Sequence, residues 1–139
     1  VTYALGSCIA VCVFDPVSKL GAMIHYVLPD STIDKNRART QPAMFADSGL
    51  PVLMQELAKA GCTGRGLQAK VIGGASITGA PQVFNVGKRN VMAAKKLMWK
   101  HNLRIVGSEV GGNISRTVRL DTTTGRVRVT TPGMPPREL

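Results

Sequence analysis

The sequence predicts an α+β fold, in which a layered β-sheet core, mixed or antiparallel and sandwich-like, carries amphipathic helices packed on one side. Three observations support this class. Short apolar runs of strand length dominate both ends of the chain, two longer segments show helical spacing, and an Asp-Thr-Thr-Thr-Gly turn joins the last two runs into a meander. At 139 residues the chain is long enough for one domain with a real core. We therefore expect a single domain over residues 1–139.

The expected strands are runs rich in apolar and β-branched residues, bounded by turn-forming residues. They lie near residues 2–5, 9–14, 20–27, 67–72, 103–107, 114–120 and 126–131. The run 9–14 is apolar at every position, which is typical of a strand buried on both faces. We expect this strand at the centre of the fold.

Two segments are expected to form helices that cover a sheet face. The first spans 48–60, with Asp47 or Ser48 as its N-cap, and the second spans 87–100 after Asn85. Each has apolar residues recurring at helical spacing, which indicates one buried face. For the second helix that face comprises Val91, Met92, the aliphatic stem of Lys95, Met98 and Trp99.

A hairpin near the N-terminus brings together a cysteine and a histidine. Asp15-Pro16-Val17-Ser18 has the signature of a type I turn, so the apolar runs on either side of it are expected to pair. If the turn is centred between Pro16 and Val17, Cys8 lies directly opposite His25. Opposed residues have Cβ atoms about 5 Å apart, close enough for an imidazole to take the proton of a thiol. The spacing therefore predicts Cys8 as a nucleophile and His25 as its base.

Other registers and roles stay open for this pair. A loop of four or five residues would shift the pairing, and a one-residue slip would turn His25 to the opposite face. Cysteine is also often buried for packing alone. However, Gly6 and Ser7 are poor strand formers and favour a bend that exposes the sulfur of Cys8. Such a bend would leave the backbone N–H groups of Ser7 and Cys8 available to an oxyanion.

The charge balance favours an acidic partner. Lys and Arg number 18 against 8 Asp and Glu, which gives a net charge of +10. The cations are spread along the chain, aromatic residues make up only 4%, and no nucleic-acid-binding motif is present. We therefore expect no nucleic-acid partner.

The cysteines and the hydropathy pattern indicate the compartment. The three cysteines form no CxxC pair and no metal-ligand spacing with His25 or His101, so we expect neither a metal site nor a cofactor. Sparse cysteines favour the reducing cytoplasm, and no run is apolar enough for insertion into a membrane. Because the chain begins with Val1, we expect it to be truncated at its N-terminus, and we expect residues 132–139 to form a loose tail.

Six stretches in order along the chain together resemble the CheD family of chemoreceptor glutamine deamidases. Together they span nearly the whole chain, so the resemblance is more specific than any single motif. The stretches are Thr2 to Val11, His25 to Pro29, Ile72 to Ala75, Asn85 to Asn90, Gly111-Gly112 with Arg116, and Thr124 to Val127.

The resemblance implies a cysteine hydrolase with a Cys–His–Thr triad, similar in fold to the catalytic domain of deamidating bacterial toxins. The triad maps to Cys8, His25 and Thr2. The implied substrate is a glutamine on the cytoplasmic, acid-rich helices of methyl-accepting chemotaxis receptors, and the implied second partner is a CheC-type phosphatase. The basic residues of the polar loop after His25 are the expected contacts to that substrate. They are Lys35, Arg37 and Arg39.

Two other function classes remain open. A non-enzymatic chemotaxis adaptor, binding a receptor or a CheC-type phosphatase, would not need Cys8 and His25 to be paired. A nucleic-acid binder would lose affinity steeply as salt rises. Within the enzyme class, the same triad is also suited to hydrolysing receptor methyl esters.

Overall fold

The computed structural model describes residues 1–76 and 85–139. Within these ranges two short 3-10 helices, Ser31–Ile33 and Pro42–Met44, accompany the main elements. The strands and α-helices are β1 (Thr2–Leu5), β2 (Ile9–Asp15), β3 (Leu20–Tyr26), α1 (Lys35–Thr40), α2 (Ala46–Lys59), β4 (Gln68–Gly73), α3 (Val86–Lys100), β5 (Arg104–Val110), β6 (Arg116–Leu120), β7 (Val127–Thr130) and β8 (Arg137–Glu138).

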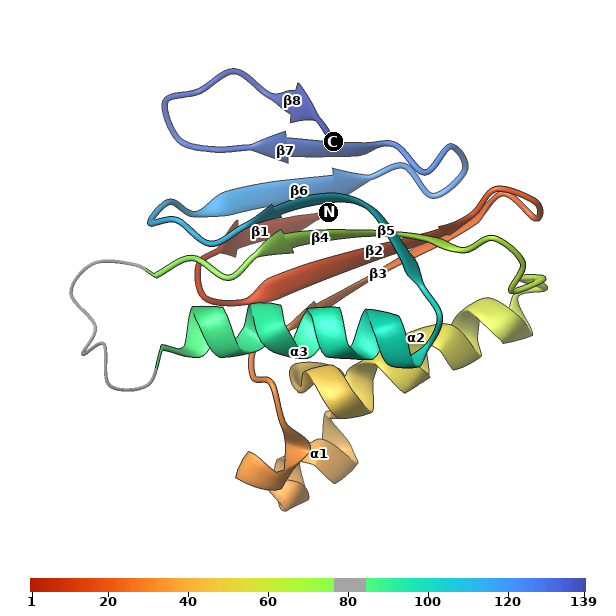
Figure 1. Ribbon diagram of the computed structural model, residues 1–139, viewed down its shortest axis with the longest axis horizontal. Helices are drawn as coiled ribbons and strands as arrows, with labels where there is room; N and C mark the ends of the chain where they lie inside the picture. The colour runs from red at the N-terminus through yellow and green to blue at the C-terminus, as the bar shows by residue number, and fades with distance from the viewer. Residues whose placement is uncertain (77–84) are drawn as a thin grey trace.

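The elements form two four-stranded sheets and a helical layer (Figure 1). The first sheet has the order β1-β6-β7-β8 and is antiparallel throughout. The second has the order β3-β2-β4-β5, in which β4 and β5 are parallel. Helices α2 and α3 lie together below the second sheet (Figure 1). The predicted α+β layered fold, with helices on one side of a mixed sheet core, is confirmed.

Strand β2 contributes to two separate cores. Ile9, Val11 and Val13 pack with residues of α2 and α3. Ala10 and Cys12 point the other way and pack with residues of β1, β6 and β7. Because side chains alternate along a strand, this one element is buried on both faces, as expected from its unbroken apolar run.

The hairpin of β2 and β3 has a different register from the predicted one. His25 pairs with Ala10, so the prediction that Cys8 lies directly opposite it is wrong by two positions. The last pair is Asp15 with Leu20, which makes the connecting turn four residues long rather than two. A shift of two residues keeps every side chain on its original face. His25 therefore still lies on the inter-sheet side, where Cys8 also packs.

The buried carboxylate of Asp15 accounts for the longer turn. It accepts hydrogen bonds from the Val17 N–H at 2.9 Å and the Ser18 hydroxyl at 2.7 Å. It also accepts from the Cys62 thiol at 3.2 Å and from the N–H and hydroxyl of Thr63, both at 2.9 Å. These bonds, that of Ser18 foremost, hold the pKa of Asp15 well below its usual range. Contacts from distant sequence therefore shape the turn.

Three local expectations also need correction. Neither Asp47 nor Ser48 caps α2, because the helix begins earlier, at Ala46, with Phe45 as its N-cap. The Asp47 carboxylate accepts bonds from the N–H and hydroxyl of Ser31. The buried face of α3 follows the predicted stripe only in part. Met98 is buried as expected, but Met92 is 62% and Trp99 86% exposed, and the other buried residues of α3 are Gly87, Asn90, Ala94 and Leu97. In the tail expected to be loose, β8 pairs with β7.

Among the described residues, no helix is both long and apolar enough to cross a membrane.

Candidate active site

A hydrogen bond between Thr2 and His25 joins the two sheets. Thr2 Oγ1 lies 2.7 Å from His25 Nδ1. Thr2 is on β1 and His25 is on β3, and each of these is an edge strand of its own sheet. If His25 Nδ1–H donates to the threonine oxygen, Nε2 is left unprotonated and can accept a proton. This contact brings together two of the three predicted triad residues, which are 23 positions apart in the sequence.

A β-bulge in β1 turns Thr2 toward the inter-sheet side. Thr2 pairs with Val118 and Leu5 pairs with Arg116, so three steps along β1 match two along β6. Residues three apart in a regular strand face opposite ways, but the extra residue puts Thr2 and Leu5 on one face. Ala4, inside the bulge, has a φ of 52°, a left-handed conformation that non-glycine residues seldom adopt.

Cys8 lies immediately before β2 with a partly buried thiol. Burial raises its pKa, and its own backbone N–H opposes that shift to a lesser extent. Partial burial also lowers the pKa of His25, although one side of this residue is open to solvent. Both shifts favour a neutral thiol and a neutral imidazole near pH 7. A base must therefore remove the thiol proton as attack begins.

The backbone around Cys8 is held by the loop that follows β4. The carbonyls of Gly6 and Cys8 accept hydrogen bonds from the N–H groups of Ala75 and Gly74, both at 2.8 Å. Within the part of the chain that the structure describes, no backbone carbonyl accepts from the N–H of Ser7 or Cys8. These are the two N–H groups that the sequence suggested for an oxyanion.

The close approach of this loop depends on glycine. Gly73 has a φ of 118°, and a Cβ there would lie 2.2 Å from the Cys8 carbonyl oxygen. A Cβ on Gly87, in the first turn of α3, would lie 2.6 Å from the Ala75 carbonyl oxygen. The Gly73-Gly74 pair thus permits the close approach of this loop to the backbone around Cys8.

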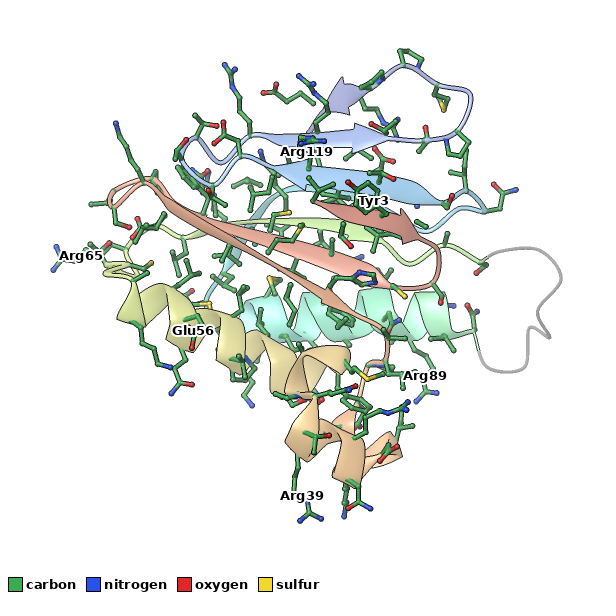
Figure 2. The ribbon with its side chains drawn as sticks, turned by 180° about the vertical axis from the view of Figure 1, so that it is seen from behind. Tyr3, Arg39, Glu56, Arg65, Arg89 and Arg119 are labelled. Carbon is green, nitrogen blue, oxygen red and sulfur yellow. The ribbon has the colours of Figure 1, made fainter. Side chains whose placement is uncertain are left out.

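The three basic residues expected to bind substrate lie elsewhere. Lys35, Arg37 and Arg39 are on α1, beyond the helical layer. Figure 2 shows Arg39 at the tip of that end and Tyr3, the neighbour of Thr2, among the strands. In the described ranges, no hydrogen bond or ion pair connects the three with the triad residues.

Comparison with known proteins places the chain in a family. The family model described as "CheD chemotactic sensory transduction" matches residues 27–131. The chain belongs to the CheD family. The CheD match begins just after His25, whereas full-length alignments with CheD relatives extend over the triad positions.

Several named CheD relatives are similar over most of the chain. "Probable chemoreceptor glutamine deamidase CheD 1" of Syntrophus aciditrophicus is 48% identical over 139 residues, which are 100% of this chain and 87% of the relative. The CheD protein of Solibacter usitatus is 48% identical over 91% of this chain and 75% of its own length. That of Syntrophotalea carbinolica is 45% identical over 95% of this chain and 83% of its own. Both are also named probable chemoreceptor glutamine deamidases.

Sequence reasoning overlooked one residue of this region, Asn90. It is fully buried in α3 and its side chain reaches the backbone of Ser7. The only sequence signal was its place at the end of the Asn85 to Asn90 stretch.

Proposed function

We propose that this protein is a protein-glutamine deamidase that converts glutamine side chains of chemotaxis receptors to glutamate and releases ammonia. The names of its CheD relatives support this activity. The observation that carries it is the Thr2–His25 hydrogen bond, which orients an imidazole on the same inter-sheet side as Cys8. A non-enzymatic adaptor would have no use for that arrangement.

The proposed reaction has two halves. His25 Nε2 takes the proton of Cys8 as Sγ attacks the amide carbon of glutamine. The N–H groups of Ser7 and Cys8 hold the oxyanion, and His25 returns the proton to the departing ammonia. Water then attacks the thioester, gives a proton to His25 and releases Cys8 as a thiol. The product is a glutamate side chain.

The activity is tested by incubating the protein with cytoplasmic fragments of chemotaxis receptors. Peptide mapping should show a gain of about one mass unit at particular glutamines, the difference between an amide and the acid that hydrolysis makes. Fragments incubated without the protein are the control. Receptor fragments that bind the protein but keep every glutamine would favour the adaptor.

Substitution of Thr2 tests its proposed role in orienting His25. Thr2→Ala should lower kcat roughly 10- to 100-fold, because the imidazole loses the hydrogen bond that sets its tautomer and direction. Thr2→Ser keeps the hydroxyl and should recover much of the loss. Thermal melts run beside the deamidation rates separate this role from a stabilising one. A Thr2→Ala protein that melts earlier but is fully active per folded molecule would contradict it.

We further propose that the basic residues of α1 bind the acidic receptor helix at a distance from the triad. Reversing Lys35, Arg37 and Arg39 to Glu should raise KM about 10-fold and leave kcat nearly unchanged, since charged surface contacts act mainly on encounter. The effect should shrink at salt concentrations that shorten the Debye length below about 8 Å.

Reversing three arginines on the first sheet, at the other end of the molecule from α1, controls for the change in net charge. Arg119, Arg126 and Arg128 are exposed on β6 and β7 or the turn between them, and Figure 2 shows Arg119 far from Arg39. Reversing these three changes the net charge by the same amount. If both triple variants raise KM equally, α1 is not a docking surface.

We infer that the reaction takes place in the cytoplasm, because the proposed target glutamines lie on the cytoplasmic part of the receptors. All three cysteines are free, which suits a reducing compartment. A CheC-type phosphatase as a second partner stays a prediction from the family resemblance. Competition between such a phosphatase and receptor fragments for the protein is the binding measurement that checks it.

A further inference from the structure

Asn90 is a buried polar residue that the proposed mechanism does not use. It lies in the second turn of α3 and has no exposed surface. Its Nδ2 donates two hydrogen bonds, to the Ser7 carbonyl at 2.9 Å and to the Val27 carbonyl at 2.8 Å. Since both partners are acceptors, the amide can be oriented in only one way.

The two carbonyls lie beside the two residues that carry the proposed chemistry. Ser7 directly precedes Cys8, and Val27 lies two residues after His25. The pairing of β2 with β3 ends at Ile9 and Tyr26. Beyond that pair the two segments of the chain separate, and there the Asn90 side-chain amide bridges them. Asn90 therefore replaces the ladder as the link between these segments.

The bond to Ser7 also determines the direction of the next N–H group. The described peptide bonds are all trans, and in a trans peptide the C=O and N–H point opposite ways. Because the Ser7 carbonyl points to α3, the Cys8 N–H points away from α3. That is the inter-sheet side, where the Cys8 side chain packs.

A packing role alone does not account for asparagine here. Asn90 Oδ1 is buried and has no hydrogen-bond partner among the described residues. A residue selected only to fill space would avoid an unpaired polar atom in the core. Its NH₂ group, in contrast, is fully used by the two carbonyls.

We propose that Asn90 is a positioning residue, which orients the Ser7–Cys8 peptide so that its N–H faces the oxyanion formed during attack. This inference rests on the proposed function, because it needs Cys8 as the nucleophile. Asn90 does not touch the reacting atoms. It acts through the peptide that does.

The test compares two reactions of Cys8 that differ in their need for an oxyanion site. Deamidation passes through a tetrahedral oxyanion, whereas alkylation by iodoacetamide displaces iodide at a saturated carbon and forms none. Asn90→Leu, which has a similar shape but no donors, should lower kcat roughly 10- to 100-fold. KM and the rate of Cys8 alkylation should stay within about threefold of wild type, because the thiol and the docking surface are unchanged.

Two further variants keep the test decisive. Asn90→Ser supplies a single hydroxyl donor for two carbonyls, so it should lower kcat by less, and it serves if Asn90→Leu does not fold. Tyr26→Phe is the matched control, because the Tyr26 hydroxyl donates to the Asn90 backbone carbonyl at 2.7 Å and not to Ser7. It should lower thermal stability and leave kcat per folded molecule unchanged.

Two outcomes would overturn the positioning role. One is a wild-type kcat in folded Asn90 variants, and the other is a loss of Cys8 alkylation in parallel with kcat, which would indicate general disorder of the site. Cys8→Ala separates this result from the proposed function. If Cys8→Ala is inactive while the Asn90 variants keep full kcat, only the positioning role fails. If Cys8→Ala stays active, the proposed function itself fails.

Discussion

Replacing Cys8 with alanine is expected to lower the rate of glutamine deamidation by at least about a thousandfold, because the other described thiol on the inter-sheet side, that of Cys12, is buried and out of a substrate's reach. The three cysteines differ in their surroundings. Cys12 is 3% exposed in the inter-sheet core, where burial raises its pKa to about 12. Burial also raises the pKa of Cys62, and its thiol donates to the carboxylate of Asp15. Cys8 lies on the same inter-sheet side as His25 and is only partly buried, so its thiol is open to a substrate where that of Cys12 is not.

Cys12→Ala is the matched control for this loss. It removes a sulfur from the same strand region, four residues along the chain, and should keep nearly all the activity of wild type per folded molecule. Deamidation rates and thermal melts of both variants make the comparison. A Cys8→Ala protein with a tenth or more of wild-type activity would exclude Cys8 as nucleophile.

Replacing His25 with alanine is expected to have an effect of similar size and to change the pH profile. Burial lowers the pKa of His25 below its ordinary value of 6.5, so the neutral base persists to more acidic pH. In wild type, kcat/KM should therefore rise with pH through a midpoint below 6.5. His25→Ala should lose that midpoint together with most of the activity.

Steady-state rates between about pH 4 and pH 9 measure both the loss of activity and the midpoint, because the pH dependence of kcat/KM reports the pKa values of the free enzyme's essential acid and base. The receptor fragment must stay folded over that range, which circular dichroism checks. A midpoint above 6.5 would mean that a nearby negative charge stabilises the imidazolium, contrary to the neutral pair described here. The same midpoint in His25→Ala would assign it to another group.

The strands could be predicted because their signal is local. The unbroken apolar run of residues 9–14 indicated a central strand, and β2 lies between two cores. The register could not be predicted in the same way. It follows from the turn at Asp15, whose carboxylate also binds Cys62 and Thr63 from far along the chain. Cys8 and His25 remained on one side only because the error was an even number of residues.

The rest of the site depends on features with weak sequence signals. The family resemblance indicated Thr2, but nothing in its neighbourhood showed that a bulge with Ala4 at positive φ would turn it toward His25. On α3, hydrophobic spacing favoured Met92 and Trp99 as buried, yet both are exposed, and the small and polar residues Gly87, Asn90 and Ala94 are buried beside Leu97 and Met98. Asn90 is buried because its side chain donates to two carbonyls. Hydropathy scores a polar residue as exposed and so could not predict this.

The most direct measurement of the central claim is the mass of the protein quenched in acid during turnover of a receptor fragment that contains a target glutamine. We expect an adduct on the peptide that contains Cys8, lighter than the sum of protein and fragment by about 17 mass units, because thioester formation expels ammonia. Cys8→Ala should show no adduct and no turnover. An adduct on Cys12 or Cys62, or steady deamidation with Cys8 unmodified at every time point, would contradict the account.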